Sequence, residues 1–317
     1  MNVPKRYIIL GLCALSVMIS YADRTNIAIA ELDMKKELHL SDTTLGMINS
    51  SFFIGYAITQ IIGGWVADKY GGKLVLLVAV SGWSIFTFIV PFAVQKGLVV
   101  FIITRILLGA AEGVGFPAVH SMLGKWIPSN ESSRAVSLVT AFSYLGAILS
   151  STVASALMGS YGWRSIFYSF GLIGMIWCIP WIYFAENQPP ELRALNESDQ
   201  SDTYVVSNSL ISNHQRTYTR IKHDFSSSES EESYGLENVA SDKVHVRDRE
   251  HVGTPWRRIL LAKEVWAIIL NQFAQSWGFF TVLFYLPTYF EVVHGLKSDQ
   301  AGFMTVLPNL IQVILSN

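Results

Sequence analysis

The chain has 317 residues, of which 51% are hydrophobic and 15% are charged, and its mean hydropathy is +0.36. This composition is too apolar for an ordinary soluble domain and predicts a polytopic membrane protein. The net charge of −1, without a basic run, gives no reason to expect nucleic acid as a partner.

Apolar segments of near-membrane length recur along the chain and end in a partial one that begins near Ala301. Each full segment is close to the ~20 residues that a helix needs to cross a bilayer. The amino-terminal segment lacks a small-residue cleavage site, so it predicts a first helix and not a signal peptide. Lysine and arginine in the short loops favour a cytoplasmic amino terminus. The segments lie at 7–30, 46–66, 74–94, 98–124, 135–157, 165–185 and 264–290.

A polar segment at 187–255 separates the sixth and seventh apolar segments. It begins with Pro189-Pro190 and contains a serine-rich acidic run, so it cannot bury a core. We expect a disordered cytoplasmic linker there, between a six-helix bundle at 1–186 and a partial second bundle at 256–317. Six spans, a linker and further spans are typical of a transporter built from two six-helix halves. The second half has only helix 7 and the start of helix 8, so we expect the sequence to be truncated.

The first segment carries Asp23 and Arg24 roughly 9 Å below its outer end, at 1.5 Å per residue. The fourth segment carries Arg105 at a similar depth, roughly 10 Å from the same side. Charges inside a membrane are costly and usually face a cavity or a partner. The two arginines could converge on one anion, because guanidinium forks match carboxylate and phosphate. A structural ion pair between Asp23 and Arg105 is the alternative.

The second segment leaves the membrane through GGWVADKYGGK, which covers residues 63–73. Its glycines permit a tight turn and a close approach between helices. Asp68 could pair with a basic residue of a neighbouring helix and so latch one conformation, or it could be a solvated loop charge. The residues that we assign to this gate are Gly64, Asp68, Lys69, Gly71, Lys73 and the candidate partner Arg134.

On the fourth segment, Arg105, Gly109 and Glu112 fall at i, i+4 and i+7 and therefore share one face. Burial in a low-dielectric cavity favours the protonated form of Glu112, and the charge of Arg105 opposes it. An anion bound to Arg105 would remove that opposition, so anion and proton could travel together. His120 lies about two turns further on and could relay the proton, or it could be a packing histidine. Pro117 predicts a kink in this helix.

The fourth segment reads R-x3-G-x2-E-G-x2-FP-x2-H over residues 105–120. Together with the gate signature, this motif resembles the anion:cation symporter branch of the major facilitator superfamily. That branch includes sialin, vesicular glutamate transporters, sodium–phosphate cotransporters and plant plastid-type phosphate transporters. The resemblance covers about 7–186 and resumes at Trp256. It implies an all-α major facilitator fold.

The same resemblance implies roles for individual residues. Similar proteins use the positions of Arg24 and Arg105 for anion binding and that of Glu112 for proton coupling. Asp23 resembles the acidic residue of sugar-acid and plant-type members, so ion coupling could run through Asp23 as well as Glu112. Vesicular glutamate members have arginine where Gln275 stands, so phosphate is favoured over glutamate. Gln275 could line the cavity or make an interhelical hydrogen bond.

The sequence contains no Walker loop, metal-ligand cluster or nucleophile arrangement, so we expect neither an enzyme nor a cofactor or metal. We expect a multi-pass integral membrane protein. Its function would be secondary active transport of a small anion, inorganic phosphate or an organic carboxylate, by H+ or Na+ symport with alternating access. Its partners would be the anion, the coupling ion and the lipid bilayer. The alternatives are a transport-dead anion sensor or seven-helix receptor, or an inactive fragment of the transporter.

Overall fold

The computed structural model describes residues 4–190 and 261–306, and every regular element in these ranges is a helix. The chain divides into two compact units, one of residues 1–189 with 276–317 and one of residues 190–275. The first unit carries the helical bundle. Most of the predicted linker, 187–255, lies outside the described residues.

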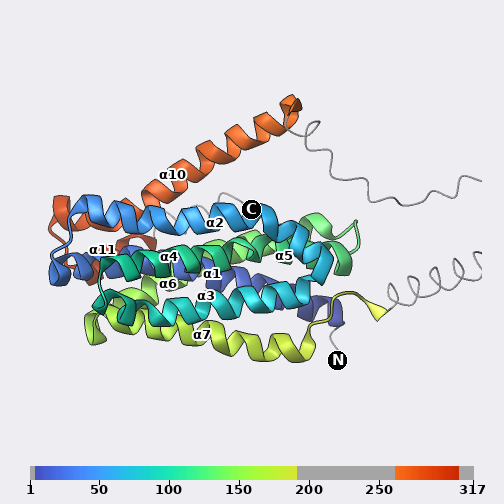
Figure 1. The fold of residues 1–317 in the computed structure, drawn as a ribbon, viewed down its shortest axis with the longest axis horizontal. Helices are drawn as coiled ribbons and strands as arrows, with labels where there is room; N and C mark the ends of the chain where they lie inside the picture. The colour runs from blue at the N-terminus through green and yellow to red at the C-terminus, as the bar shows by residue number, and fades with distance from the viewer. Residues whose placement is uncertain (1–3, 191–260, 307–317) are drawn as a thin grey trace, which may run out of the picture. The chain divides into compact units, whose positions relative to one another are not determined.

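The helices follow the predicted apolar segments, and most of them extend a few residues beyond their segment (Figure 1). Within the described ranges, six helices are long and apolar enough to cross a membrane, and a seventh counts if the bent α2 is one span. The protein is therefore a multi-pass membrane protein with the all-α fold that the sequence predicts. The helices are α1 Lys5–Leu38, α2 Asp42–Tyr70, α3 Gly72–Gln95, α4 Leu98–Gly113, α5 Gly115–Trp126, α6 Ser132–Tyr161, α7 Trp163–Phe184, α10 Lys263–His294 and α11 Ser298–Met304.

The fourth predicted segment is a broken helix, because α4 ends at Gly113 and α5 begins at Gly115. Pro117 explains this break. Its nitrogen has no hydrogen to donate to the carbonyl of Gly113, four residues earlier, and its ring crowds that carbonyl. Val114 between the two helices is a turn residue. The kink predicted from Pro117 thus lies three residues before the proline itself.

The helices of the first unit pack in matched pairs. The helix α1 packs mainly against α6, α2 against α4, and α3 against α7. These are the first span with the fifth, the second with the fourth, and the third with the sixth. Each of the first three spans therefore packs against one of the last three spans. This arrangement is typical of the inverted repeats inside a six-helix transporter half.

The helix α1 is the interior helix of the bundle. Its most apolar window is 72% buried, whereas the corresponding value for α3 is 50% and for α6 is 33%. Lipid can therefore reach little of α1, and its polar side chains must find partners inside the protein. This position explains why α1 tolerates an aspartate and an arginine in mid-span.

The backbones of α2 and α4 touch at small residues. A Cβ atom on Gly109 would lie 2.0 Å from the carbonyl oxygen of Phe52, and one on Gly113 would lie 2.5 Å from that of Tyr56. No side chain fits at either place, so glycine is required for this approach. The contact holds the arginine and glutamate of α4 against the aromatic residues of α2.

The buried apolar residues form two clusters along the helices. On α1, one cluster takes residues between Ile9 and Ile19, and the other takes residues from Ala22 to Met34. On α4, Leu108 belongs to the first cluster and Phe101 to the second. The buried charges of α1 and α4 lie near the junction of these two clusters.

Candidate functional site

The centre of the site is an ion pair between the first and fourth predicted spans. The Nε atom of Arg24 donates to Oε1 of Glu112 at 2.6 Å, and the Ser20 hydroxyl donates to the same oxygen. The Arg24 side chain is 5% exposed and that of Glu112 is 1% exposed. Arg24 Nη2 and Glu112 Oε2 have no hydrogen-bond partner in the described part of the chain. Each member of the pair therefore retains unused hydrogen-bonding capacity.

Aromatic rings surround the Arg24 guanidinium. Its Cζ atom lies 4.5 Å from the ring centroid of Tyr56, 5.0 Å from that of Tyr21 and 5.6 Å from that of Phe52. The Cζ atom of Arg105 lies 5.1 Å from the same Phe52 ring. Cations are attracted to the faces of such rings, more strongly where water is excluded. Both arginines thus contact the Phe52 ring and lie in the same interior region of the bundle.

Arg105 is 2% exposed and makes no hydrogen bond or ion pair with any residue that the structure describes. Its Nε atom is buried without an acceptor. Longer-range Coulombic interactions link it to Glu112, Glu31 and Asp23. A buried charge without a direct partner is unfavourable. Arg105 is therefore the group in this site most in need of an anion.

Asp23 is buried but is held by neutral donors. The Asn26 side-chain amide donates to its Oδ1 at 3.1 Å, and the Thr87 hydroxyl donates to its Oδ2 at 3.1 Å. Within the described residues Asp23 forms no ion pair, so the structural Asp23–Arg105 pair considered above is not formed. The carboxylate of Glu112, and not that of Asp23, is the direct counter-charge of Arg24.

His120 lies outside this cluster. It is exposed on α5, and its ring centroid lies 6.2 Å from that of Phe116. The Phe116 ring in turn lies 6.0 Å from Tyr21, which borders Arg24. An aromatic pair therefore stands between the histidine and the ion pair, and His120 makes no direct contact with Glu112.

Gln275 lies on α10, is exposed, and belongs to the second compact unit. Its predicted role in lining the cavity stays a prediction.

The gate signature binds parts of the bundle together at the opposite end from the α1–α2 connection. The Ser121 hydroxyl of α5 donates to Asp68 at 3.1 Å, and Lys69 lies 4.7 Å from the Trp65 ring. The backbone N–H of Lys73 donates to the side chain of Asn187 at 3.0 Å. The signature therefore joins α2 and α3 to α5 and to the segment after α7.

Two details of the predicted gate differ from the structure. Asp68 does not pair with Arg134 among the described residues, because it faces α5 while Arg134 is exposed near the start of α6. Gly64 has no atom within 4 Å of an added Cβ, so no close approach requires it. Gly71 is required, since its φ of +89° and the 2.5 Å between an added Cβ and Asn187 both exclude a side chain.

Sequence reasoning missed the residues that surround the charges. They are Ser20, Phe52, Tyr56 and Thr87. Ser20 precedes Arg24 by four residues, which places both on one face of α1, and Phe52 and Tyr56 have the same spacing on α2. That spacing was a usable signal for each helix alone. The contact of Thr87 on α3 with Asp23 depends on tertiary packing, and no local pattern announces it.

The chain resembles known membrane transporters along almost its whole length. Residues 13–316 match the family model of the Major Facilitator Superfamily. The chain is 36% identical to the chloroplastic ascorbate transporter of Arabidopsis thaliana, over 99% of the chain and 51% of that protein. It is 35% identical to sodium-dependent phosphate transport protein 1, chloroplastic, of the same plant, over 99% of the chain and 54% of the relative.

A more distant relative and a solved structure agree with this. Vesicular glutamate transporter 3 of Danio rerio is 32% identical over 99% of the chain and 50% of its own length. The chain thus spans about half the length of these curated relatives. A crystal structure of the D-xylose-proton symporter matches 97% of the chain and 66% of that protein, with a TM-score of 0.67 and 18% identity. That likeness concerns the fold alone.

Proposed function

Because the chain belongs to the major facilitator superfamily, and its curated relatives include anion transporters as the sequence motif predicts, we propose that it is a secondary active transporter of a small anion. The substrate class is inorganic phosphate or an organic carboxylate. Transport is symport with H+ or Na+, by alternating access.

One observation carries the proposal. Arg105 is a buried guanidinium without a direct partner in the described chain, and it shares the Phe52 ring with Arg24. Two planar guanidinium forks offer several donors to an anion with two or more oxygen atoms. Phosphate and carboxylates have this shape. The relatives are named as transporters of ascorbate, phosphate and glutamate, which are all small anions with several oxygen atoms.

Coupling between anion and proton follows because the Glu112 carboxylate can bind either Arg24 or a proton. In the structure the Glu112 carboxylate accepts a hydrogen bond from the Arg24 guanidinium. An incoming anion therefore competes with Glu112 for the same guanidinium. A proton on Glu112 removes the negative charge and releases Arg24 to the anion. Binding free energies are reciprocal, so a bound anion favours protonation of Glu112 by the same factor. Proton and anion therefore bind together and leave together.

Alternating access supplies the movement. In this fold one half rocks against the other around a site near the middle of the membrane. The ion pair that joins α1 to α4, near the junction of the two apolar clusters, is our candidate for such a site. Loading with anion and proton replaces the Arg24–Glu112 contact, and this exchange is the signal that allows the halves to move.

The test is uptake by the purified protein in proteoliposomes. Radiolabelled phosphate, gluconate, glutamate and sialic acid are offered under an imposed pH gradient or an imposed Na+ gradient. We expect phosphate to accumulate under one of the two gradients, and the Arg105→Gln variant to lose this accumulation. Lys96→Gln is the matched control, because Lys96 is an exposed cation at the end of α3. Accumulation of none of the four anions, or equal accumulation by Arg105→Gln, would overturn the proposal.

The Glu112→Gln variant separates a transporter from a sensor or receptor. A transporter loses gradient-driven accumulation and retains exchange of labelled for unlabelled phosphate across the membrane. A receptor binds phosphate and shows neither process in any variant.

A further inference from the structure

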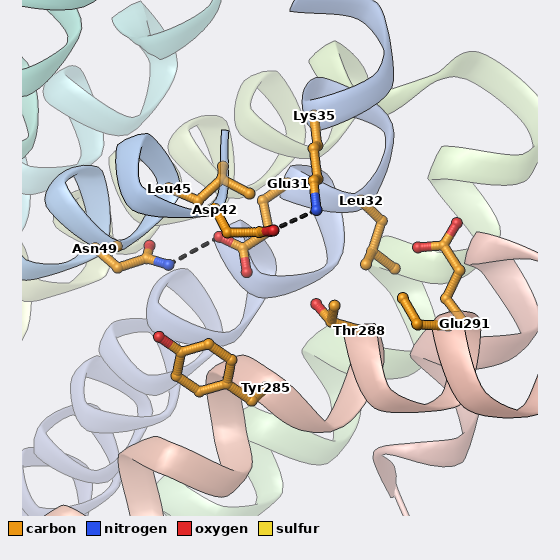
Figure 2. A pocket seen from close by; sticks show the side chains of 11 residues that line it. Glu31, Leu32, Lys35, Asp42, Leu45, Asn49, Tyr285, Thr288 and Glu291 are labelled. Carbon is orange, nitrogen blue, oxygen red and sulfur yellow. Dashed lines mark hydrogen bonds and ion pairs between the residues drawn. The ribbon is translucent and has the colours of Figure 1, made fainter. Parts of the chain in front are cut away.

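A pocket of about 320 Å³ lies at the end of the bundle that carries the α1–α2 connection. We call this the outer end, after the predicted orientation. The end of α1, the beginning of α2 and the last turns of α10 form its walls (Figure 2). Three carboxylates, those of Glu31, Asp42 and Glu291, line it beside the ammonium group of Lys35.

Two of these carboxylates have cationic partners. Asp42 forms an ion pair with Lys35, and Glu291 forms one with Lys36 and accepts a hydrogen bond from Ser298 at 3.3 Å. The Asp42 side chain is 83% exposed, so this part of the pocket opens towards solvent.

Glu31 is the exception. It is 7% exposed, and its direct partner is a neutral amide, Asn49 Nδ2, which donates to Oε2 at 2.8 Å. Figure 2 shows its carboxylate between Asn49 on α2 and Tyr285 and Thr288 on α10. The Oδ1 atom of Asn49 is itself buried without a hydrogen-bond partner among the described residues. A protonated Glu31 could donate a hydrogen bond to an oxygen atom such as Asn49 Oδ1, whereas the ionised carboxylate has no hydrogen to donate.

The charges that face Glu31 from the surrounding helices are few. Lys35 and Arg105 act on it through Coulombic interactions, and Asp42 on α2 and Glu291 on α10 line the same pocket. These three carboxylates are not gathered closely enough for a metal ion, since the described residues hold no group of three or more metal-ligating side chains. A proton suits Glu31, because a neutral carboxyl group needs no cationic partner and the hydrogen-bond partner of Glu31 is a neutral amide.

Glu31 also stands in line with the anion site. It follows Arg24 by seven residues, so both lie on one face of α1 and roughly 10 Å apart along the axis. Arg105 interacts through space with both Glu31 and Glu112. Glu31 lines the pocket and lies nearer the outer end of α1 than Arg24 does.

We propose that Glu31 is a second proton-coupling residue, which takes up a proton from the outer side through this pocket and thereby strengthens anion binding at Arg105. The proton leaves a hydronium ion of the pocket water and forms one O–H bond on the carboxylate. Neutral Glu31 no longer offsets the positive charge of Arg105, so the anion is held more strongly. This inference rests on the proposed function for its role in transport, but proton uptake by Glu31 can be measured without transport.

The first test is infrared titration of the purified protein in detergent, from mildly alkaline to mildly acidic pH. The band of a protonated carboxylic acid should grow in the wild type, and this growth should be smaller by one group in Glu31→Gln. Glu37→Gln is the matched control: Glu37 is an outer-end carboxylate of the same helix that binds Arg164 and Trp163 and does not line the pocket. Equal band growth in Glu31→Gln and wild type would overturn the proposal.

If Glu31→Gln does not fold, as judged by circular dichroism, Glu31→Asp replaces it. This variant keeps the carboxyl group but withdraws it from Asn49 by one methylene. The midpoint of its band should then differ from that of the wild type, and an identical midpoint would contradict the inference.

The second test uses phosphate in proteoliposomes. In Glu31→Gln, accumulation driven by a pH gradient should fall about tenfold, within the usual range of coupling between two sites. Exchange of labelled for unlabelled phosphate should persist and should depend less on the outer pH than in the wild type, because Glu112 remains the other proton-coupling group. Wild-type dependence on outer pH in this variant would count against Glu31. If wild-type protein moves no anion at all, the proposed function fails, and the infrared titration still decides whether Glu31 takes up a proton.

Discussion

Replacing Glu112 with glutamine should destabilise the protein by an amount that an added anion restores. The substitution removes one charge of a pair whose side chains are 5% and 1% exposed and leaves Arg24 without a counter-charge. Breaking a buried ion pair on one side costs about 3–5 kcal/mol. We expect the lower end of that range, because a glutamine oxygen still accepts from Ser20 and Arg24 and because three aromatic rings remain around the guanidinium.

The assay is equilibrium unfolding in mixed detergent micelles, followed by circular dichroism, with and without phosphate. Glu186→Gln is the matched control, because Glu186 forms an ion pair with Lys5 and their side chains are 48% and 42% exposed. An exposed pair of this kind contributes about 0–1 kcal/mol. Phosphate is added to both proteins at one concentration. At 100 times the dissociation constant of the wild type, it stabilises the wild type by about 2.7 kcal/mol.

We expect phosphate to stabilise Glu112→Gln more than the wild type, because in the variant the anion meets no competing carboxylate at Arg24. Two results would refute the reasoning. The first is a loss of stability in Glu112→Gln no larger than in Glu186→Gln. The second is an equal effect of phosphate on Glu112→Gln and wild type.

Three further substitutions test the parts of the site, and one of them has a matched control variant. Arg105→Lys keeps the charge but loses the planar fork, so phosphate affinity measured by calorimetry should fall about tenfold, the loss of one charge-assisted hydrogen bond; unchanged affinity would mean that the fork is unused. Gly109→Ala places a methyl group 2.0 Å from the Phe52 carbonyl and should cost about 1–3 kcal/mol in the unfolding assay. Gly124→Ala, where nothing lies within 4 Å, should be neutral or stabilising by up to about 1 kcal/mol, and equal effects of the two would contradict the packing argument. Phe52→Leu removes the ring shared by Arg24 and Arg105 and should destabilise the protein by about 1–2 kcal/mol, with weaker phosphate binding; intact stability and binding would show that the ring has no role.

The spans and the buried charges could be predicted from the sequence because both are local properties. A run of apolar residues long enough to cross a bilayer marks a helix wherever it packs, and the observed helices follow those runs. An arginine or glutamate inside such a run must avoid lipid. Arg24, Arg105 and Glu112 are indeed buried within the bundle. The break at Pro117 could be predicted in the same way. Proline has no N–H to donate to the carbonyl of Gly113, and α4 ends at Gly113.

The choice of partners could not be predicted, because it depends on how the helices are rotated against one another. Arg24 contacts Glu112, while Asp23 turns to Thr87 on α3. Depth along each helix was available from residue counting, but the facing direction was not. The pocket beside Glu31 could not be predicted for the same reason, since it forms only where α1, α2 and α10 meet.

The central claim is that Arg105 and Arg24 hold an anion in a shared interior. The most direct measurement is equilibrium binding of radiolabelled phosphate to the purified protein, compared between wild type, Arg105→Gln and the surface control Lys96→Gln. We expect saturable binding to wild type and to Lys96→Gln, and a loss of about tenfold or more in affinity for Arg105→Gln, as the removal of a charged hydrogen-bond donor implies. Phosphate binding to Arg105→Gln with wild-type affinity would contradict the claim.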